Sequence, residues 1–137
     1  MKRILVFSFL TLAIVLGACS KNNDNTSAAN ATPIVQVGTW KVTLFSDSGN
    51  DQTIDFNGYV FTFNNGVITA VKNAITQNGS WSSGSGKFNI DFGPKSAGNK
   101  PLGELTDDWK ILSMSDSQIR LGDNNAASNE FLTLTKN

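Results

Sequence analysis

The sequence of 137 residues contains no histidine and only a single cysteine. Histidine is the commonest general base and metal ligand near neutral pH, so its absence excludes a Ser-His-Asp triad and histidine-based metal sites. The chain also lacks a phosphate-binding glycine loop and a nucleophile elbow. Its 11 Lys and Arg balance 11 Asp and Glu, which leaves no basic patch of the size that nucleic-acid binding needs. We therefore expect no enzymatic activity, no metal, no cofactor and no nucleic-acid partner.

The N-terminus has the three-part layout of an export signal. Lys2 and Arg3 precede an apolar run that ends in small residues just before Cys19. This run is shorter than the roughly 20 residues that a helix needs to span a bilayer. A membrane anchor helix or a buried helix is the alternative interpretation. The polar tract that follows at once favours the export signal.

The segment Leu16-Gly17-Ala18-Cys19 resembles a bacterial lipobox. The resemblance implies that the Cys19 sulfur takes a diacylglycerol, that the chain is cleaved after Ala18, and that the new amino terminus is acylated, for example with palmitate. Lipidation accounts for an odd cysteine in an exported chain, which otherwise indicates a free thiol or an intermolecular disulfide. Several acyl chains would anchor the protein firmly, because each buried methylene contributes about 0.8 kcal/mol.

The residue after the cysteine is Ser20, not Asp. In such lipoproteins this choice favours the outer membrane of a Gram-negative cell. The tract that follows contains one acidic residue, Asp24, and resembles the surface-export tract of Bacteroidetes lipoproteins only weakly. The periplasmic and the outer face of the membrane therefore both stay open.

The polar segment 20–33 shows no hydrophobic periodicity, which predicts a flexible tether. We therefore divide the chain into a signal peptide at 1–18, the lipidated Cys19 with its tether over 19–35, and a globular domain over 36–137. About 100 residues are enough for one hydrophobic core and not for two.

From residue 37 onward, apolar and polar residues alternate with a period of two, as in antiparallel strands with one buried face. Trp40, Val42 and Leu44 form the first such series. Asn65-Gly66 predicts a two-residue hairpin turn. Nine runs are candidates for about eight strands, one run being a continuation or a bulge: 37–45, 52–56, 58–64, 67–72, 76–82, 87–92, 108–114, 117–122 and 130–136.

The breaks between the runs carry turn residues. Further hairpins are plausible at 82–86 and 115–117. The connection at 94–105 is long, and we expect one short helical turn near 101–105 that tucks in Leu102 and Leu105.

The sequence GTW at 38–40 opens the first strand and resembles the Gly-x-Trp signature of lipocalins. The order of the later segments fits as well: an aromatic strand with an Asn-Gly hairpin, then GSWSS, then DDWKILSMSDSQIRL, and a final FLTLTK. The whole of 36–137 resembles the short lipocalin-like domains of Bacteroidetes lipoproteins. The resemblance implies a small all-β domain, an antiparallel lipocalin-like barrel of about eight strands.

Seven residues are candidates for either a ligand site or the barrel core. They are Trp40, Tyr59, Phe61, Phe63, Trp81, Trp109 and Arg120. An eight-stranded barrel is just wide enough to be filled by side chains or to hold one small ligand. The large inward residues favour a filled barrel over an apolar cup. We expect Trp40 to plug one end, and Arg120 either to stack on an indole there or to be solvated.

The acidic residues do not form a recognisable site. Asp47, Asn50 and Asp51 do not match the spacing of a calcium-binding loop, and a turn cluster is the simpler interpretation. Asp107 and Asp108 are neighbours on a predicted strand, so they point to opposite faces and cannot flank a glycosidic bond together.

Three non-catalytic functions remain. The first is a lipid-anchored domain that binds a small hydrophobic ligand or another molecule through its loops or a small open end. The second is a structural or inhibitor-like partner of another envelope protein, with a contact surface formed by the loops at 46–52, 94–106 and 122–129. The third is a ligand carrier with an open apolar cup.

Overall fold

The computed structural model describes residues 30–137. The predicted signal peptide, Cys19 and the tether residues 19–29 lie outside the described residues. The strands are β1 (Trp40–Asp47), β2 (Asn50–Asp51), β3 (Val60–Asn64), β4 (Val67–Lys72), β5 (Ile75–Gly84), β6 (Lys87–Asp91), β7 (Asp107–Met114), β8 (Gln118–Gly122) and β9 (Phe131–Lys136). The helical segments are α1 (Thr32–Val35) and the 3-10 helices η2 (Thr53–Phe56), η3 (Ala97–Asn99), η4 (Leu102–Leu105) and η5 (Ala126–Ser128).

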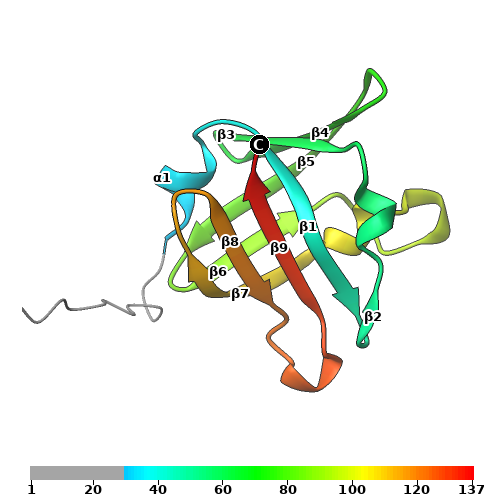
Figure 1. Ribbon diagram of the computed structural model, residues 1–137, viewed down its shortest axis with the longest axis vertical. Helices are drawn as coiled ribbons and strands as arrows, with labels where there is room; N and C mark the ends of the chain where they lie inside the picture. Colours follow the sequence, from blue (N-terminus) through cyan, green and yellow to red (C-terminus); the bar gives the residue numbers. More distant parts are fainter. Residues whose placement is uncertain (1–29) are drawn as a thin grey trace, which may run out of the picture.

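The strands form a closed antiparallel barrel (Figure 1). Strands β3 to β9 pair in chain order, and β9 then pairs with β1. The pair Trp40 and Phe61 joins β1 to β3 and closes the ring. The two-residue β2 pairs with β1 outside this ring of eight. The predicted all-β barrel of about eight strands is confirmed.

The antiparallel order gives the barrel two different ends. At one end, which we call the α1 end, lie α1, the C-terminus and the short turns at 65–66, 85–86 and 115–117. The opposite end, which we call the loop end, holds the connections 48–59, 73–74, 92–106 and 123–130. Figure 1 shows α1 and the longer connections on different sides of the barrel.

Two-residue turns with left-handed backbone join several strands. The predicted Asn65-Gly66 turn is present, with φ of 46° and 80° between the paired Asn64 and Val67. Positive φ at both central residues matches the right-handed twist of the flanking strands. Asn73 and Ala74 form the same kind of turn between β4 and β5, with φ of 51° and 64°. The sequence alone did not indicate this turn, because alanine rarely adopts positive φ.

The folded domain begins earlier than the sequence predicted. Ala31 and Val35, which were assigned to the tether, are completely buried. The Trp40 Nε1–H donates a hydrogen bond to the Val35 carbonyl at 2.9 Å. The Ala31 N–H donates one to Ser83 Oγ at 2.9 Å. Residues 31–35 are therefore part of the folded domain and cover the α1 end of the barrel.

Two local predictions were wrong. The segment 52–56 is not a strand but the 3-10 helix η2, because the Phe45 N–H bonds to the Thr53 hydroxyl at 2.9 Å and the chain then turns. A bulge between Val42 and Leu44 shifts the register of β1 against β9. Phe45 is consequently buried in place of Leu44, which is half-buried.

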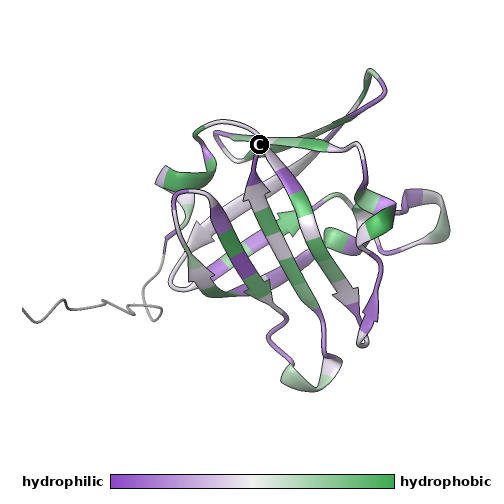
Figure 2. Ribbon diagram, in the orientation of Figure 1, coloured by the Kyte–Doolittle hydropathy of each residue, from purple (hydrophilic) through white to green (hydrophobic). Residues whose placement is uncertain are grey.

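The interior of the barrel is filled with apolar side chains. Alternation of apolar and polar residues along the strands is visible in Figure 2. The rings of Phe63, Trp81 and Phe88 contact one another, with centroids 5.4–5.7 Å apart. As predicted, a helical turn, η4, buries Leu102 and Leu105. Such packing is what an eight-stranded barrel permits when its inward residues are large.

Candidate functional site

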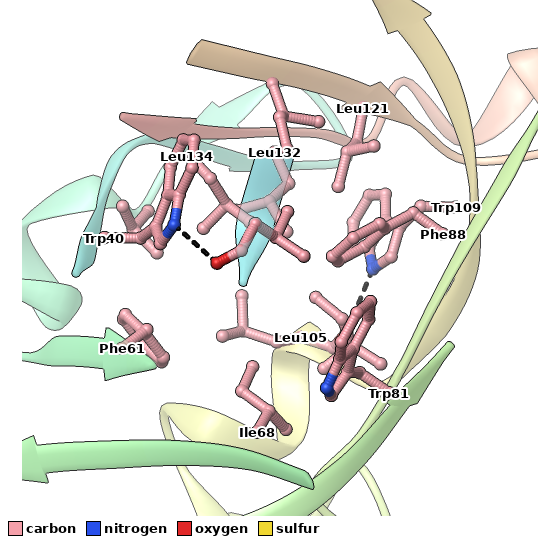
Figure 3. Close-up of a cluster of buried hydrophobic side chains, with 14 of the residues drawn as sticks. Trp40, Phe61, Ile68, Trp81, Phe88, Leu105, Trp109, Leu121, Leu132 and Leu134 are labelled. Atoms are coloured by element: carbon pink, nitrogen blue, oxygen red, sulfur yellow. Dashed lines mark hydrogen bonds between the residues drawn. The ribbon is translucent and has the colours of Figure 1, made fainter. Parts of the chain in front are cut away.

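The predicted site residues separate into three environments. Most of them are core: Trp40, Phe61 and Trp109 are completely buried, and Phe63 and Trp81 are 2 % and 6 % exposed. Figure 3 shows these tryptophans among the buried side chains, with hydrogen bonds drawn from Trp40 and Trp109.

The other two residues are outside the core. Arg120 is exposed on β8. The cation that lies over the Trp40 ring is Lys136, whose Nζ is 5.2 Å from the ring centroid. Tyr59 is half-buried at the loop end and stacks on Phe61, with centroids 6.0 Å apart. Of the seven residues, Tyr59 is therefore the one that joins the core to a surface cavity.

That cavity is part of a groove at the loop end, which we call the Lys72–Lys100 groove. It consists of two cavities of about 250 and 440 Å³ that share Lys72 and Lys100. The other lining residues are Tyr59, Asn73, Ile75 and Gln77 in the first cavity, and Ile54, Asp55 and Pro101 in the second. Three separate connections of the barrel, 48–59, 73–74 and 92–106, therefore meet at this groove.

The Lys72 side chain has a defined position in the groove. Its Nζ lies 4.8 Å from the centroid of the Tyr59 ring, within the range of a cation–π contact. Its stem passes over the backbone of Gly58, where an added Cβ would be 3.7 Å from Lys72 Cε. In the described part of the chain, Lys72 forms no salt bridge. Its ammonium group therefore faces the groove without a carboxylate partner.

The Lys100 side chain is partly neutralised. Its Nζ lies 3.2 Å from Oε1 of Glu104, four residues further along the chain. An ammonium group has three N–H donors, so this pair leaves donors for another acceptor. Lys100 is thus held at the groove and still able to bind.

A second group of charges lies at the loop end. Oxygens of Asp107, Asp123 and Glu130 are all within 4.8 Å of one another. Lys95 Nζ lies 3.1 Å from Glu130 Oε1 and 3.3 Å from Asp107 Oδ2. We call these four residues the Lys95 cluster. The Lys95 ammonium group already supplies a cation to these carboxylates.

The ionisation of the Lys95 cluster follows from burial and pairing. Burial raises the pKa of Glu130 above its ordinary 4.5, although hydrogen bonding and attraction to Lys95 oppose this rise. Burial also acts to lower the pKa of Lys95, but the Glu130 and Asp107 carboxylates outweigh it and raise that pKa. Hydrogen bonds from Ser128 and Asn125 lower the pKa of Asp123.

The remaining acidic residues have local partners. Asp108 points away from the Lys95 cluster, and its Oδ2 lies 3.0 Å from Lys87 Nζ. Asp107 and Asp108 therefore point to opposite faces, as expected for neighbours on a strand. Hydrogen bonds to Thr53 lower the pKa of Asp51. Asp51 accepts the Thr53 N–H at 2.9 Å, which fits a turn cluster.

The sequence analysis missed both the groove and the Lys95 cluster. Lys72 and Lys100 are far apart in the sequence and meet only through the barrel topology. Glu130, Asp107 and Lys95 are likewise brought together from three segments. Neither the groove residues nor the Lys95 cluster has a recognisable spacing in the sequence, so only the three-dimensional structure reveals them.

The structure combines a Gly-x-Trp sequence at the start of β1 with strands paired in chain order and a barrel filled by apolar side chains. The chain matches the lipocalin-like domain family over residues 37–121. The protein belongs to this lipocalin-like family. The predicted family resemblance is thereby confirmed.

Two solved structures resemble this lipocalin-like chain. An uncharacterized protein from Bacteroides eggerthii is 17 % identical, with a TM-score of 0.54; the match covers 74 % of this chain and 99 % of that one. A protein from Burkholderia xenovorans is 15 % identical, with a TM-score of 0.50, over 78 % of this chain and 86 % of that one. A search of curated proteins found no significant match. At these identities the structural likeness speaks for the fold alone.

Among the described residues, no helix is both long and apolar enough to cross a bilayer.

Proposed function

We propose that this protein is a lipid-anchored lipoprotein of the cell envelope whose lipocalin-like barrel binds, without catalysis, through its loop end. The observation that carries the proposal is the position of residue 31 at the α1 end, opposite the long connections. A lipid on Cys19 would tie the barrel to the membrane from that side. The loop end, on the opposite side of the barrel, would then be left free for ligands or partners.

The anchor is tested by membrane fractionation. We expect the wild-type chain to sediment with the outer membrane of a Gram-negative host and to stay there after a high-salt wash. Cys19→Ala should move the protein to the soluble fraction, because the thiol is the group that takes the lipid. Ser20→Ala keeps the thiol and serves as the matched control. Membrane retention of Cys19→Ala after the wash would refute the lipobox interpretation.

The binding function is tested by native mass spectrometry of the full chain released from membranes with detergent. A co-purifying small mass that is lost when the loop end is altered supports a ligand-binding domain. The Lys72–Lys100 groove is the described cavity that best fits such a role, because it combines free donors, an aromatic face and apolar side chains. Binding sites commonly combine apolar walls with a few polar groups in this way.

A second function is a structural or inhibitor-like partner of another envelope protein. It is favoured by the loops at 46–52, 94–106 and 122–129, which all lie at the loop end. Chemical cross-linking in whole cells distinguishes it from ligand binding. A protein cross-linked to these three loops, together with a bare mass in the native spectrum, supports the partner role.

A further inference from the structure

We propose that the first cavity of the Lys72–Lys100 groove binds a small organic anion, with its carboxylate or phosphate between the two lysines and its apolar body against Tyr59 and Ile75. This inference deepens the proposed binding function and rests on it. It names the site and the chemical class of the ligand.

The charge of the first cavity selects an anion. Lys72 and Lys100 both line it, and no carboxylate is among its lining residues. The second cavity contains the same two lysines but adds Asp55, which opposes an anion there. Glu104 satisfies one donor of Lys100. Among the described residues, Lys72 has no carboxylate partner. Charge-assisted hydrogen bonds from ammonium groups to anionic oxygens are about twice as strong as neutral ones.

The walls of the first cavity select an organic body. Ile54 and Ile75 are 71 % and 69 % exposed, the two most exposed of the large apolar side chains in the described chain. Each lines one of the two cavities of the groove. Each isoleucine gives its cavity an apolar wall beside polar groups, a combination that small-molecule sites commonly have. The Tyr59 ring adds an aromatic surface held in place by stacking on Phe61.

The size of the first cavity limits the ligand. About 250 Å³ is slightly below the range of roughly 300–1,000 Å³ that is usual for pockets holding drug-sized ligands. The filled barrel offers no continuation inward, because Phe61 behind Tyr59 is completely buried. The ligand is therefore a compact molecule lying at the mouth of the barrel. Asn73 and Gln77 provide amide groups for any further polar substituent.

The test is a titration of the full chain in non-ionic detergent, followed by amide NMR shifts. Benzoate and phenyl phosphate are the anionic probes, and benzamide is the neutral probe of nearly the same shape. We expect both anions to shift the amides of Asn73, Ile75 and Gln77, and to bind at least fivefold more tightly than benzamide. The stronger of the two anions distinguishes a carboxylate site from a phosphate site. Raising the salt concentration should weaken both anions and leave benzamide unchanged.

The variants locate the charge. Lys72→Gln and Lys100→Gln should each weaken the better anion at least fivefold, while Lys72→Arg should keep the affinity within about threefold because it retains the charge. Lys41→Gln is the matched control, since Lys41 is an exposed lysine on β1 that does not line the groove. Equal affinities for benzamide and benzoate would refute the selection of an anionic ligand and would leave the proposed binding at the loop end intact. Shifts outside the groove, or no binding of any probe, would overturn the site. The proposed function has its own tests: membrane fractionation of Cys19→Ala tests the lipid anchor, and native mass spectrometry tests binding at the loop end.

Discussion

The buried tryptophans offer a matched pair for measuring what an indole hydrogen bond contributes to this barrel. Trp40 and Trp81 are 0 % and 6 % exposed. The Trp40 Nε1–H bonds to the Val35 carbonyl at 2.9 Å. The Trp81 Nε1, by contrast, has no hydrogen-bond partner among the described residues. Figure 3 shows both side chains in one cluster. Replacement by phenylalanine removes the N–H in both cases and shortens the aromatic surface by a similar amount.

The expected difference follows from the cost of an unpaired buried donor. In Trp40→Phe the lost bond costs about 1 kcal/mol, and the Val35 carbonyl loses its partner in the core. In Trp81→Phe the change removes a donor whose burial without a partner costs about 1–3 kcal/mol. The lost bond in one variant and the relieved penalty in the other add, so Trp81→Phe should be less destabilising than Trp40→Phe by about 2–4 kcal/mol. The corresponding gap in melting temperature is about 4–8 °C for each kcal/mol in a domain of this size.

Urea unfolding of the two variants, monitored by far-UV circular dichroism, measures the two free energies of unfolding. Trp109→Phe is the control, because its Nε1–H bonds to the Leu105 carbonyl at 3.0 Å and the ring is completely buried. It should behave like Trp40→Phe. The reasoning is refuted if Trp81→Phe costs as much as the other two variants.

Two further predictions concern the loop-end cluster and the close approach of two strands. Burial raises the pKa of Glu130 above its ordinary 4.5, so just above pH 4.5 the folded state binds more protons than the unfolded state, and the free energy of unfolding rises as the pH falls from neutral toward 4.5. Urea unfolding at several pH values should show that Glu130→Gln lacks this rise, and a pH profile like that of the wild type would contradict the raised pKa. An added Cβ at Gly79 would meet the Asp91 carbonyl oxygen and Phe92, whereas one at Gly84 on the same strand meets nothing within 4 Å. We therefore expect Gly79→Ala to cost about 1–3 kcal/mol and Gly84→Ala to change the melting temperature little, and equal melting temperatures would show that the strands separate freely at Gly79.

Period-two alternation was sufficient to predict most of the barrel. Runs such as Tyr59–Phe63 carry their inward and outward positions in the residues themselves, and Asn65-Gly66 carries its turn type. Bulges are different, because a single extra residue leaves the alternation looking regular until the partner strand is known. The exchange of Leu44 for Phe45 in the core is a case in which β9 decides the register.

The segments that were predicted wrongly depend on partners distant in sequence. Ala31 and Val35 lie in a short stretch that directly follows a polar tract and is too short to show a periodicity. Hydrogen bonds to Ser83 and from Trp40 hold that stretch against the barrel. Thr53 starts a 3-10 helix, and its hydroxyl accepts the hydrogen bond from the Phe45 N–H that a neighbouring strand would otherwise accept. The groove is similar, since Lys72 and Lys100 come together only where three connections of the barrel meet. Local patterns therefore predicted the strands, and the topology determined the candidate site.

The two ends of the barrel differ in how their polar groups are used. At the α1 end, the Ala31 N–H and the Trp40 indole N–H bond to Ser83 and Val35 within the domain, and the turns are short. At the loop end, ammonium and carboxylate groups gather, and Lys72 keeps donors that the described chain does not satisfy. Replacing Lys100 by a neutral residue would cost little stability, because its exposed ion pair with Glu104 contributes about 0–1 kcal/mol, and Lys72 has no ion pair to lose among the described residues. Stability therefore gives no reason for placing Lys72 and Lys100 beside the exposed Ile54 and Ile75, and the anion site proposed above would supply one.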